Sequence, residues 1–384
     1  MKCINCGTQN NYRERIANSR HCKNCNHRFV FEPKLMYPAK FSDAFFEKLV
    51  TDISVNNTLK FTENQLYYFL NQRLIKKRPN ITSDLIFLTY LTIILVMIGF
   101  LSHQDTNGIF IIAVGILISL GIPVIATYQK NKQIKKILVS PEKFQEYLNS
   151  WKAVNPIDEI LTLPTQQNLP NSINSDITAY SFDRVVVCDS AEIANLLIAN
   201  NFHFENNSAV LSIDGYPENI FNTVMEMLRR NDDLKVYVLH DASPKGVSVV
   251  NTLSTNPDWF VNNSNSNVTI YDLGLLPRQI FKNFSNNSNF FTQISEDFAR
   301  EAKELSSNVK EDLTEKEIKW LEAGKFVELE SFTPQRLLRV ISQGILNSRQ
   351  SNNNNSGFGD SGIVSSSDSF DDCDIAVFAD DCFG

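Results

Sequence analysis

Four cysteines near the beginning of the chain have the spacing of a metal site. Cys3 and Cys6 form one C-x2-C pair, Cys22 and Cys25 form a second, and 15 residues separate the two pairs. Each pair places two thiolates on one tight turn. Two such turns supply four soft ligands in the tetrahedral arrangement of a closed structural Zn²⁺ site. The sequence therefore predicts that these cysteines bind zinc.

A redox role or a disulfide role fits the four cysteines less well. A redox dithiol needs only one C-x2-C pair, and disulfides are typical of oxidising compartments. Residues 1–32 resemble a zinc ribbon, and ribbons bind nucleic acid, bind protein or only close one end of a domain. The sequence does not choose among these three roles.

Three aspartates follow short β-branched runs in the second half of the chain. Asp189 and Asp214 each come directly after such a run, and Asp241 follows another run after one intervening residue. Helical patterns separate the runs, and a fourth run follows. The runs are Arg184–Cys188, Ala209–Ile213, Leu234–Leu239 and Val268–Tyr271.

This alternation predicts an α/β domain over residues 179–348 with a doubly wound parallel sheet. Ligands of such sheets bind beyond the carboxyl ends of the strands. Asp189, Asp214 and Asp241 are therefore a candidate Mg²⁺ site, because carboxylate oxygens are ligands that Mg²⁺ accepts. The alternative is that each aspartate caps the helix or turn that follows it. For any single aspartate, capping is a better explanation than Mg²⁺ binding. For the three aspartates together, both explanations stay open.

Two motifs in this domain resemble the Toprim domain of topoisomerase VI A subunits and of the related meiotic break-forming transesterases. Residues 213–217, IDGYP, are similar to the G-x-P turn of that family, and residues 238–246, VLHDASPKG, to its D-x-D-P-x-G motif. Residues 184–189, RVVVCD, resemble the Toprim strand that ends in a glutamate. The resemblance covers residues 183–285 and implies a Toprim-like fold.

The same resemblance gives a second meaning to residues 61–68, FTENQLYY. They are similar to the winged-helix element whose tyrosine attacks DNA, and Tyr68 matches that tyrosine. The family relationship thus implies a Mg²⁺-dependent DNA transesterase that uses Tyr68, Asp189 and Asp241. However, Ser243 stands where the family has its second aspartate, and cleavage by a tyrosine needs a fully liganded metal. We therefore expect a non-catalytic relative, with the membrane-bound transesterase or nuclease as the alternative.

Residues 41–82 are predicted to be a small helical module that positions Tyr68. Apolar residues recur there at helical spacing, and Thr62 precedes Gln65 in the spacing of a capping box. The module ends at Pro79. The simplest role for its aromatic residues, Tyr68 included, is the packing of a core.

Two apolar stretches, residues 85–101 and 109–128, contain no charged residue. Each is long enough to cross a hydrocarbon core of about 30 Å as a helix. Lys and Arg precede the first stretch and follow the second, whereas the connecting loop has neither. We expect a transmembrane hairpin over 85–128 with both termini in the cytoplasm. The alternative, a buried helix pair, would show a polar stripe.

The remaining segments are a predicted helical linker over 129–178 and a disordered, acidic, Asn- and Ser-rich tail over 349–384. The net charge is −7, yet residues 1–82 carry an excess of Lys and Arg. This excess could serve to bind anionic lipid or nucleic acid, or it could reflect only the tendency of Lys and Arg to stay on the cytoplasmic side of a membrane. We expect an integral membrane protein that tethers nucleic acid, or a protein partner bound through the ribbon or the acidic tail.

Overall fold

The computed structural model describes residues 1–76, 137–162, 184–218, 220–229, 234–259, 268–283 and 291–354. Residues Met1–Gln72 and Val139–Gly384 form one compact unit, and Arg73–Leu138 form a second. All of the described strands and most of the described helices belong to the first unit. The first unit therefore contains every element that positions the candidate sites.

The predicted transmembrane hairpin, residues 85–128, lies outside the described residues. Among the residues that are described, no helix combines the length and apolar character needed to cross a bilayer. The two membrane spans, the orientation of the termini and most of the linker 129–178 therefore stay predictions.

A buried ion pair holds the cysteine-bearing segment together. The helix α1 (Tyr12–Ala17) carries Arg15, which donates two hydrogen bonds of 2.9 Å to the carboxylate of Glu32. Arg15 also donates to the carbonyl of Asn10 at 2.7 Å. Both charged side chains are almost fully buried, so removing either one would leave an uncompensated charge.

The helical module combines segments from both sides of the predicted hairpin. It contains α2 (Asp43–Ile53), α3 (Glu63–Lys76) and α6 (Pro141–Lys152), and aromatic side chains from α2 and α6 contact each other. The short strands β1 (Phe61–Thr62) and β2 (Ile160–Leu161) pair in parallel. The two helices predicted within 41–82 are confirmed, and the structure adds α6 and the two-stranded pairing.

The predicted capping box is present and determines where α3 begins. The backbone amide of Gln65 donates to Thr62 Oγ1 at 3.1 Å, and the amide of Thr62 donates to Gln65 Oε1 at 3.1 Å. Both amides would otherwise lack a partner within the helix. Because the cap defines the register of α3, it also sets the direction in which Tyr68, one turn later, leaves the helix.

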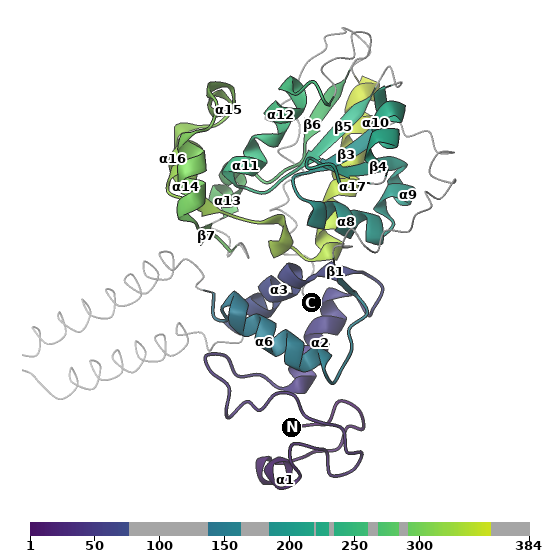
Figure 1. Cartoon of the computed structure of the whole chain (residues 1–384), viewed down its shortest axis with the longest axis vertical. Helices are drawn as coiled ribbons and strands as arrows, with labels where there is room; N and C mark the ends of the chain where they lie inside the picture. The colour runs from purple at the N-terminus through teal and green to yellow at the C-terminus, as the bar shows by residue number, and fades with distance from the viewer. Residues whose placement is uncertain are drawn as a thin grey trace, which may run out of the picture. The chain divides into compact units, whose positions relative to one another are not determined.

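A four-stranded parallel sheet forms the centre of the second half of the chain (Figure 1). Its strands are β3 (Arg184–Cys188), β4 (Ser208–Ser212), β5 (Lys235–Leu239) and β6 (Thr269–Asp272), in the order β4-β3-β5-β6. Cys188 is aligned with Ser212 on one side and with Leu239 on the other. The predicted doubly wound sheet is thus confirmed, with strand ends within two residues of the expected positions.

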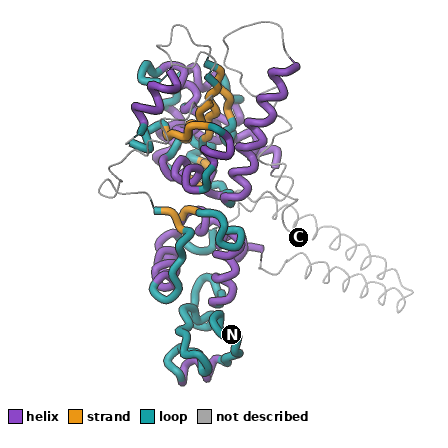
Figure 2. Tube along the Cα trace, turned by 90° about the vertical axis from the view of Figure 1, so that its right-hand side faces the viewer, coloured by secondary structure: helices purple, strands orange, loops and turns teal. Residues whose placement is uncertain are grey.

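Helices cover both faces of this sheet, and the strands lie between them in both views (Figures 1 and 2). The helices α8 (Ala191–Ala199) and α17 (Pro334–Asn354) pack on one face, and α10 (Phe221–Arg229) and α12 (Val249–Thr255) on the other. The tail was predicted to begin at residue 349, but α17 continues to Asn354. The remaining elements of this half are α9 (Phe202–Asn206), α11 (Pro244–Val247), α13 (Pro277–Asn283), β7 (Gln293–Ile294), α14 (Glu296–Lys303), α15 (Ser307–Glu311), α16 (Glu315–Glu322), β8 (Lys325–Phe326) and the 3₁₀ helix η3 (Leu329–Ser331).

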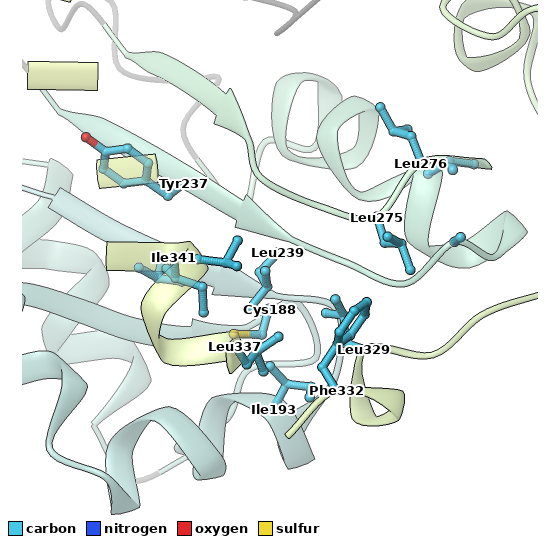
Figure 3. Close-up of a cluster of buried hydrophobic side chains, with 14 of the residues drawn as sticks. Cys188, Ile193, Tyr237, Leu239, Leu275, Leu276, Leu329, Phe332, Leu337 and Ile341 are labelled. Carbon is cyan, nitrogen blue, oxygen red and sulfur yellow. The ribbon is translucent and has the colours of Figure 1, made fainter. Parts of the chain in front are cut away.

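The segment after β8 is anchored at the carboxyl end of the sheet. Leu329 and Phe332 are buried in the same core cluster as Cys188 and Ile193 (Figure 3). Burying an aliphatic or aromatic side chain contributes about 1.5–3 kcal/mol relative to leaving it exposed. The packing therefore holds this late segment against the edge where ligands of α/β sheets bind.

Candidate functional site

The four cysteines converge as their spacing predicts. The sulfur atoms of Cys3 and Cys25 are 3.6 Å apart, as are those of Cys6 and Cys22. All four sulfur atoms lie within 4.8 Å of one another. A tetrahedral zinc with bonds of about 2.3 Å to sulfur requires sulfur atoms about 3.8 Å apart. The set therefore fits a structural Zn²⁺ ion, and the Asn10 side-chain amide supports it by donating to Cys22 Sγ at 3.4 Å.

The thiols differ in their readiness to ionise. Burial raises the pKa of Cys3 to about 12. Hydrogen bonds with Thr8 lower the pKa of Cys6 to about 5. A bound cation would favour the thiolate form throughout the set, because metal binding requires deprotonated cysteines.

Two of the three predicted aspartates meet at the carboxyl end of the sheet. Asp189, which is 6% exposed, accepts a 2.7 Å hydrogen bond from the backbone amide of Asp241 through Oδ2. Its other oxygen, Oδ1, is buried and has no hydrogen-bond partner among the described residues. Asp241 Oδ1 accepts from the amide of Leu329 at 2.6 Å. Burial raises the pKa of both carboxyl groups, and the charge of Asp189 raises that of Asp241 further.

The third predicted aspartate lies apart from this pair. Asp214 follows β4, as expected, but its side chain is 61% exposed and forms an ion pair of 3.3 Å with Lys245. Among the described residues, only the cysteine set has three or more potential metal ligands with every ligand atom within 4.8 Å of the others. The structure thus brings Asp189 and Asp241 together and leaves Asp214 at the surface.

Two glutamates that were not predicted from the sequence add to this acidic edge. Glu328 accepts a hydrogen bond from the Tyr68 hydroxyl, and Glu330 accepts from Thr62 Oγ1 at 2.6 Å and from the Asn64 side chain at 2.8 Å. Burial raises the pKa of both glutamates, and the charge of Asp189 contributes to the shift at Glu328. No local motif identifies either residue, because Tyr68 and Glu328 are 260 positions apart.

Tyr68 is held in place rather than presented to solvent. Its side chain is 3% exposed, and its ring lies 5.8 Å from that of Phe291. The hydroxyl donates to Glu328 and accepts from the Gln293 side chain. Burial raises the pKa of Tyr68, and the charge of Glu328 raises it further, so the hydroxyl stays protonated at neutral pH.

A buried histidine supports the acidic edge from the strand side. His240 Nδ1 lies 2.8 Å from the carbonyl of Asp241, and Nε2 lies 3.1 Å from Asp272 Oδ1. Burial disfavours the charged imidazole, but Asp272 outweighs burial and the pKa of His240 rises to about 9. With a proton on Nδ1, the ring donates to the Asp241 carbonyl and holds the backbone from which the Asp241 side chain extends.

The fold and the acidic edge define a Toprim-type α/β domain. Residues 184–347 match the family model of the Toprim domain of the topoisomerase 6 A-subunit/Spo11 family. This part of the chain is therefore similar to the Toprim domain of that family, as the motifs at 213–217 and 238–246 predicted. The matched range contains Asp189, Asp241 and Glu328 but not Tyr68 or the four N-terminal cysteines. A comparison of the chain with curated proteins found no match.

Proposed function

We propose that this chain is a membrane-attached protein that binds nucleic acid through Mg²⁺ at its Toprim domain and does not cleave it. The observation that supports the proposal is Asp189 Oδ1, a buried carboxylate oxygen without a hydrogen-bond partner among the described residues. The other oxygen of the same carboxylate accepts from the backbone amide of Asp241. Leaving such an atom unpaired is costly, and a divalent cation would compensate it. Asp189 and Asp241 are the residues that would hold the ion.

The acidic edge needs a cation before it can accept a nucleic acid. Among the described residues, none of Asp189, Asp241 and Glu328 forms an ion pair with a basic side chain. Unscreened carboxylates repel phosphates at short range. A bound Mg²⁺ would supply positive charge and open coordination positions for phosphate oxygens.

The position of Tyr68 supports the absence of cleavage. A tyrosine that attacks a phosphodiester must expose its oxygen and lose its proton. The Tyr68 hydroxyl is buried and hydrogen-bonded to Glu328 and Gln293. Its pKa is raised, and burial is the largest cause. These properties suit a residue that joins α3 to the Toprim domain.

Membrane attachment rests on the apolar composition of residues 85–128, and a nucleic-acid role for the first segment rests on the basic excess of residues 1–82. The zinc-binding segment would then add a second contact to nucleic acid. A protein partner, bound through residues 1–32 or the acidic segment 349–384, is the other ligand class that these features suit.

The test is fluorescence anisotropy of labelled DNA and RNA with the full chain in detergent, with and without Mg²⁺. We expect Mg²⁺ to strengthen binding and added salt to weaken it steeply, because phosphates are contacted. Asp241→Asn should abolish the Mg²⁺ effect, whereas Asp214→Asn, an exposed aspartate after a neighbouring strand, should preserve it. Binding that ignores Mg²⁺, or no binding at low salt, contradicts the proposal.

A second candidate is a Mg²⁺-dependent transesterase, and the resemblance of residues 61–68 to the family's tyrosine-bearing element favours it. In that reaction the Tyr68 oxygen bonds to phosphorus and its proton passes to Glu328. The P–O bond to one sugar oxygen breaks, and that oxygen takes up a proton. A covalent protein–DNA adduct that requires Mg²⁺ and disappears in Tyr68→Phe would establish this function in place of the first.

A further inference from the structure

The loop of residues 32–40 joins the cysteine-bearing segment to the residues that lead into α2. The rings of Phe31 and Phe41, the residues on either side of this loop, are buried and lie 4.8 Å apart. Glu32 is fixed by its buried ion pair with α1, and the amide of Leu35 donates to the carbonyl of Glu32 at 2.9 Å. The two ends of the loop are therefore close together and anchored in the fold, as in compact Ω-loops.

The tip of the 32–40 loop exposes apolar side chains to solvent. Leu35 is 62% exposed and Tyr37 is 83% exposed, and Pro38 beside them is exposed as well. Elsewhere in the described chain, large apolar side chains with strong exposure occur singly along the sequence. Apolar side chains that gather on a surface within a polar rim are typical of interaction sites. This tip is therefore a candidate contact for an apolar partner.

The rim of this tip is basic. Lys34 and Lys40 are exposed, and neither forms an ion pair with a described residue. Lys34 Nζ lies 4.1 Å from the centre of the Tyr12 ring, a contact that leaves its charge unneutralised. The only acidic residue of the loop, Glu32, is already paired with Arg15. Four more basic residues of the cysteine-bearing segment are exposed and lack an ion pair within the described part of the chain: Lys2, Arg13, Arg20 and Arg28.

We propose that the 32–40 loop inserts into the surface of an anionic lipid bilayer. Leu35 and Tyr37 enter the boundary between headgroups and acyl chains, where apolar side chains and tyrosine rings are stabilised. Lys34 and Lys40 bind the negatively charged headgroups, as basic residues do near a leaflet that contains phosphatidylserine. This inference rests on the membrane attachment proposed above and adds a surface contact to the predicted spans.

A lipid surface fits the loop better than a nucleic acid does. Single-stranded nucleic acids bind through basic side chains that contact phosphates and aromatic side chains that stack on bases. The two lysines and Tyr37 suit that mode, but a nucleic acid offers little apolar surface to an exposed aliphatic side chain such as Leu35. A bilayer accounts for the leucine, the tyrosine and both lysines together.

The experiment places the full chain in lipid nanodiscs, made of phosphatidylcholine alone or mixed with phosphatidylserine, with or without bromine on the acyl chains. Tyr37→Trp introduces an exposed fluorophore, whereas the three natural tryptophans are buried. We expect its emission to shift to shorter wavelength and to be quenched by brominated lipid, more strongly when phosphatidylserine is present. Lys34→Gln combined with Lys40→Gln should remove the increase due to phosphatidylserine, and Leu35→Ser should weaken the quenching in both lipids.

A matched control is Ile16→Trp, because Ile16 is 47% exposed on α1 of the same segment but lies outside the loop. Its emission should be quenched clearly less than that of Tyr37→Trp. Equal quenching at the two positions refutes the inference, since the whole segment then lies near the bilayer without insertion of the loop. All of these substitutions replace exposed side chains, so thermal melting should be unchanged and verifies folding.

The outcomes separate this inference from the proposed function. If the chain enters nanodiscs but brominated lipid does not quench Tyr37→Trp, membrane attachment stands and the role of the loop is refuted. If the chain does not enter nanodiscs, membrane attachment falls and this inference falls with it. If the emission of Tyr37→Trp responds to added DNA and not to lipid, the loop binds nucleic acid and the inference is overturned.

Discussion

At the scale of single residues, Tyr68 shows how a motif match and a structural role can coincide. Its position in FTENQLYY resembles that of a DNA-attacking tyrosine, yet its hydroxyl lies between Glu328 and Gln293. Tyr67 provides a comparison, because it is also buried but its hydroxyl makes no hydrogen bond to a described residue. The two neighbouring tyrosines thus differ mainly in hydrogen bonding.

Removing the Tyr68 hydroxyl should therefore destabilise the fold. We expect Tyr68→Phe to lower the free energy of unfolding by about 1.5–3 kcal/mol, the range for a hydrogen bond to a charged group. Tyr67→Phe should cost clearly less. Denaturant unfolding measures both, and equal losses in the two variants would show that the contact with Glu328 contributes nothing.

A second residue, Asp43, joins the cysteine-bearing segment to α2. Its carboxylate is fully buried and accepts from the backbone amides of Val30 at 2.9 Å and Phe31 at 2.8 Å. Asp43→Ala leaves two amides without a partner, at a cost of about 1–3 kcal/mol each. Unfolding should show a large loss for this variant and almost none for Lys48→Ala, an exposed residue of the same helix. Similar midpoints for the two variants would disprove this role.

At the scale of elements, a side chain of the Toprim domain hydrogen-bonds to the backbone of the helical module. The Asn200 side chain accepts from the amide of Lys60 at 2.8 Å and donates to the carbonyl of Lys60 at 3.0 Å. Asn200 is the C-cap residue of α8, and Lys60 directly precedes β1. The Asn200 side chain therefore satisfies both backbone groups of Lys60, as a neighbouring strand would do.

This tie predicts a local effect of Asn200→Ala. Amide exchange should become faster at residues 60–62, because both hydrogen bonds to Lys60 are lost, and the stability should fall by about 1 kcal/mol per hydrogen bond. The exposed Glu205 offers a control in Glu205→Ala. Unchanged exchange at residues 60–62 in Asn200→Ala would show that other contacts hold this segment.

The elements also show what the sequence can predict. The strands β3 to β6 were recognised because their β-branched runs are short and separated by helical patterns, and Asp189 and Asp241 were found because they follow such runs. The burial of Asp189 and the exposure of Asp214 were not predictable, since both positions look alike in the sequence. Glu328 and Gln293 were missed because their partner, Tyr68, is 260 and 225 positions away.

At the scale of the whole molecule, the chain joins a cysteine cluster that fits zinc, a helical module and a Toprim domain. Residues 85–128, predicted to cross the membrane, fall between α3 and α6, two helices of the same module. In the proposed function, this arrangement keeps the acidic edge attached to the membrane through the element that carries Tyr68.

The central claim is that the edge formed by Asp189 and Asp241 binds Mg²⁺. Isothermal titration calorimetry of the full chain with Mg²⁺ tests it most directly, with Asp189→Asn and Asp214→Asn titrated in parallel. We predict one saturable site in the unmodified chain, retained in Asp214→Asn and lost in Asp189→Asn. A chain that takes up no Mg²⁺, or a site that survives in Asp189→Asn, would contradict it.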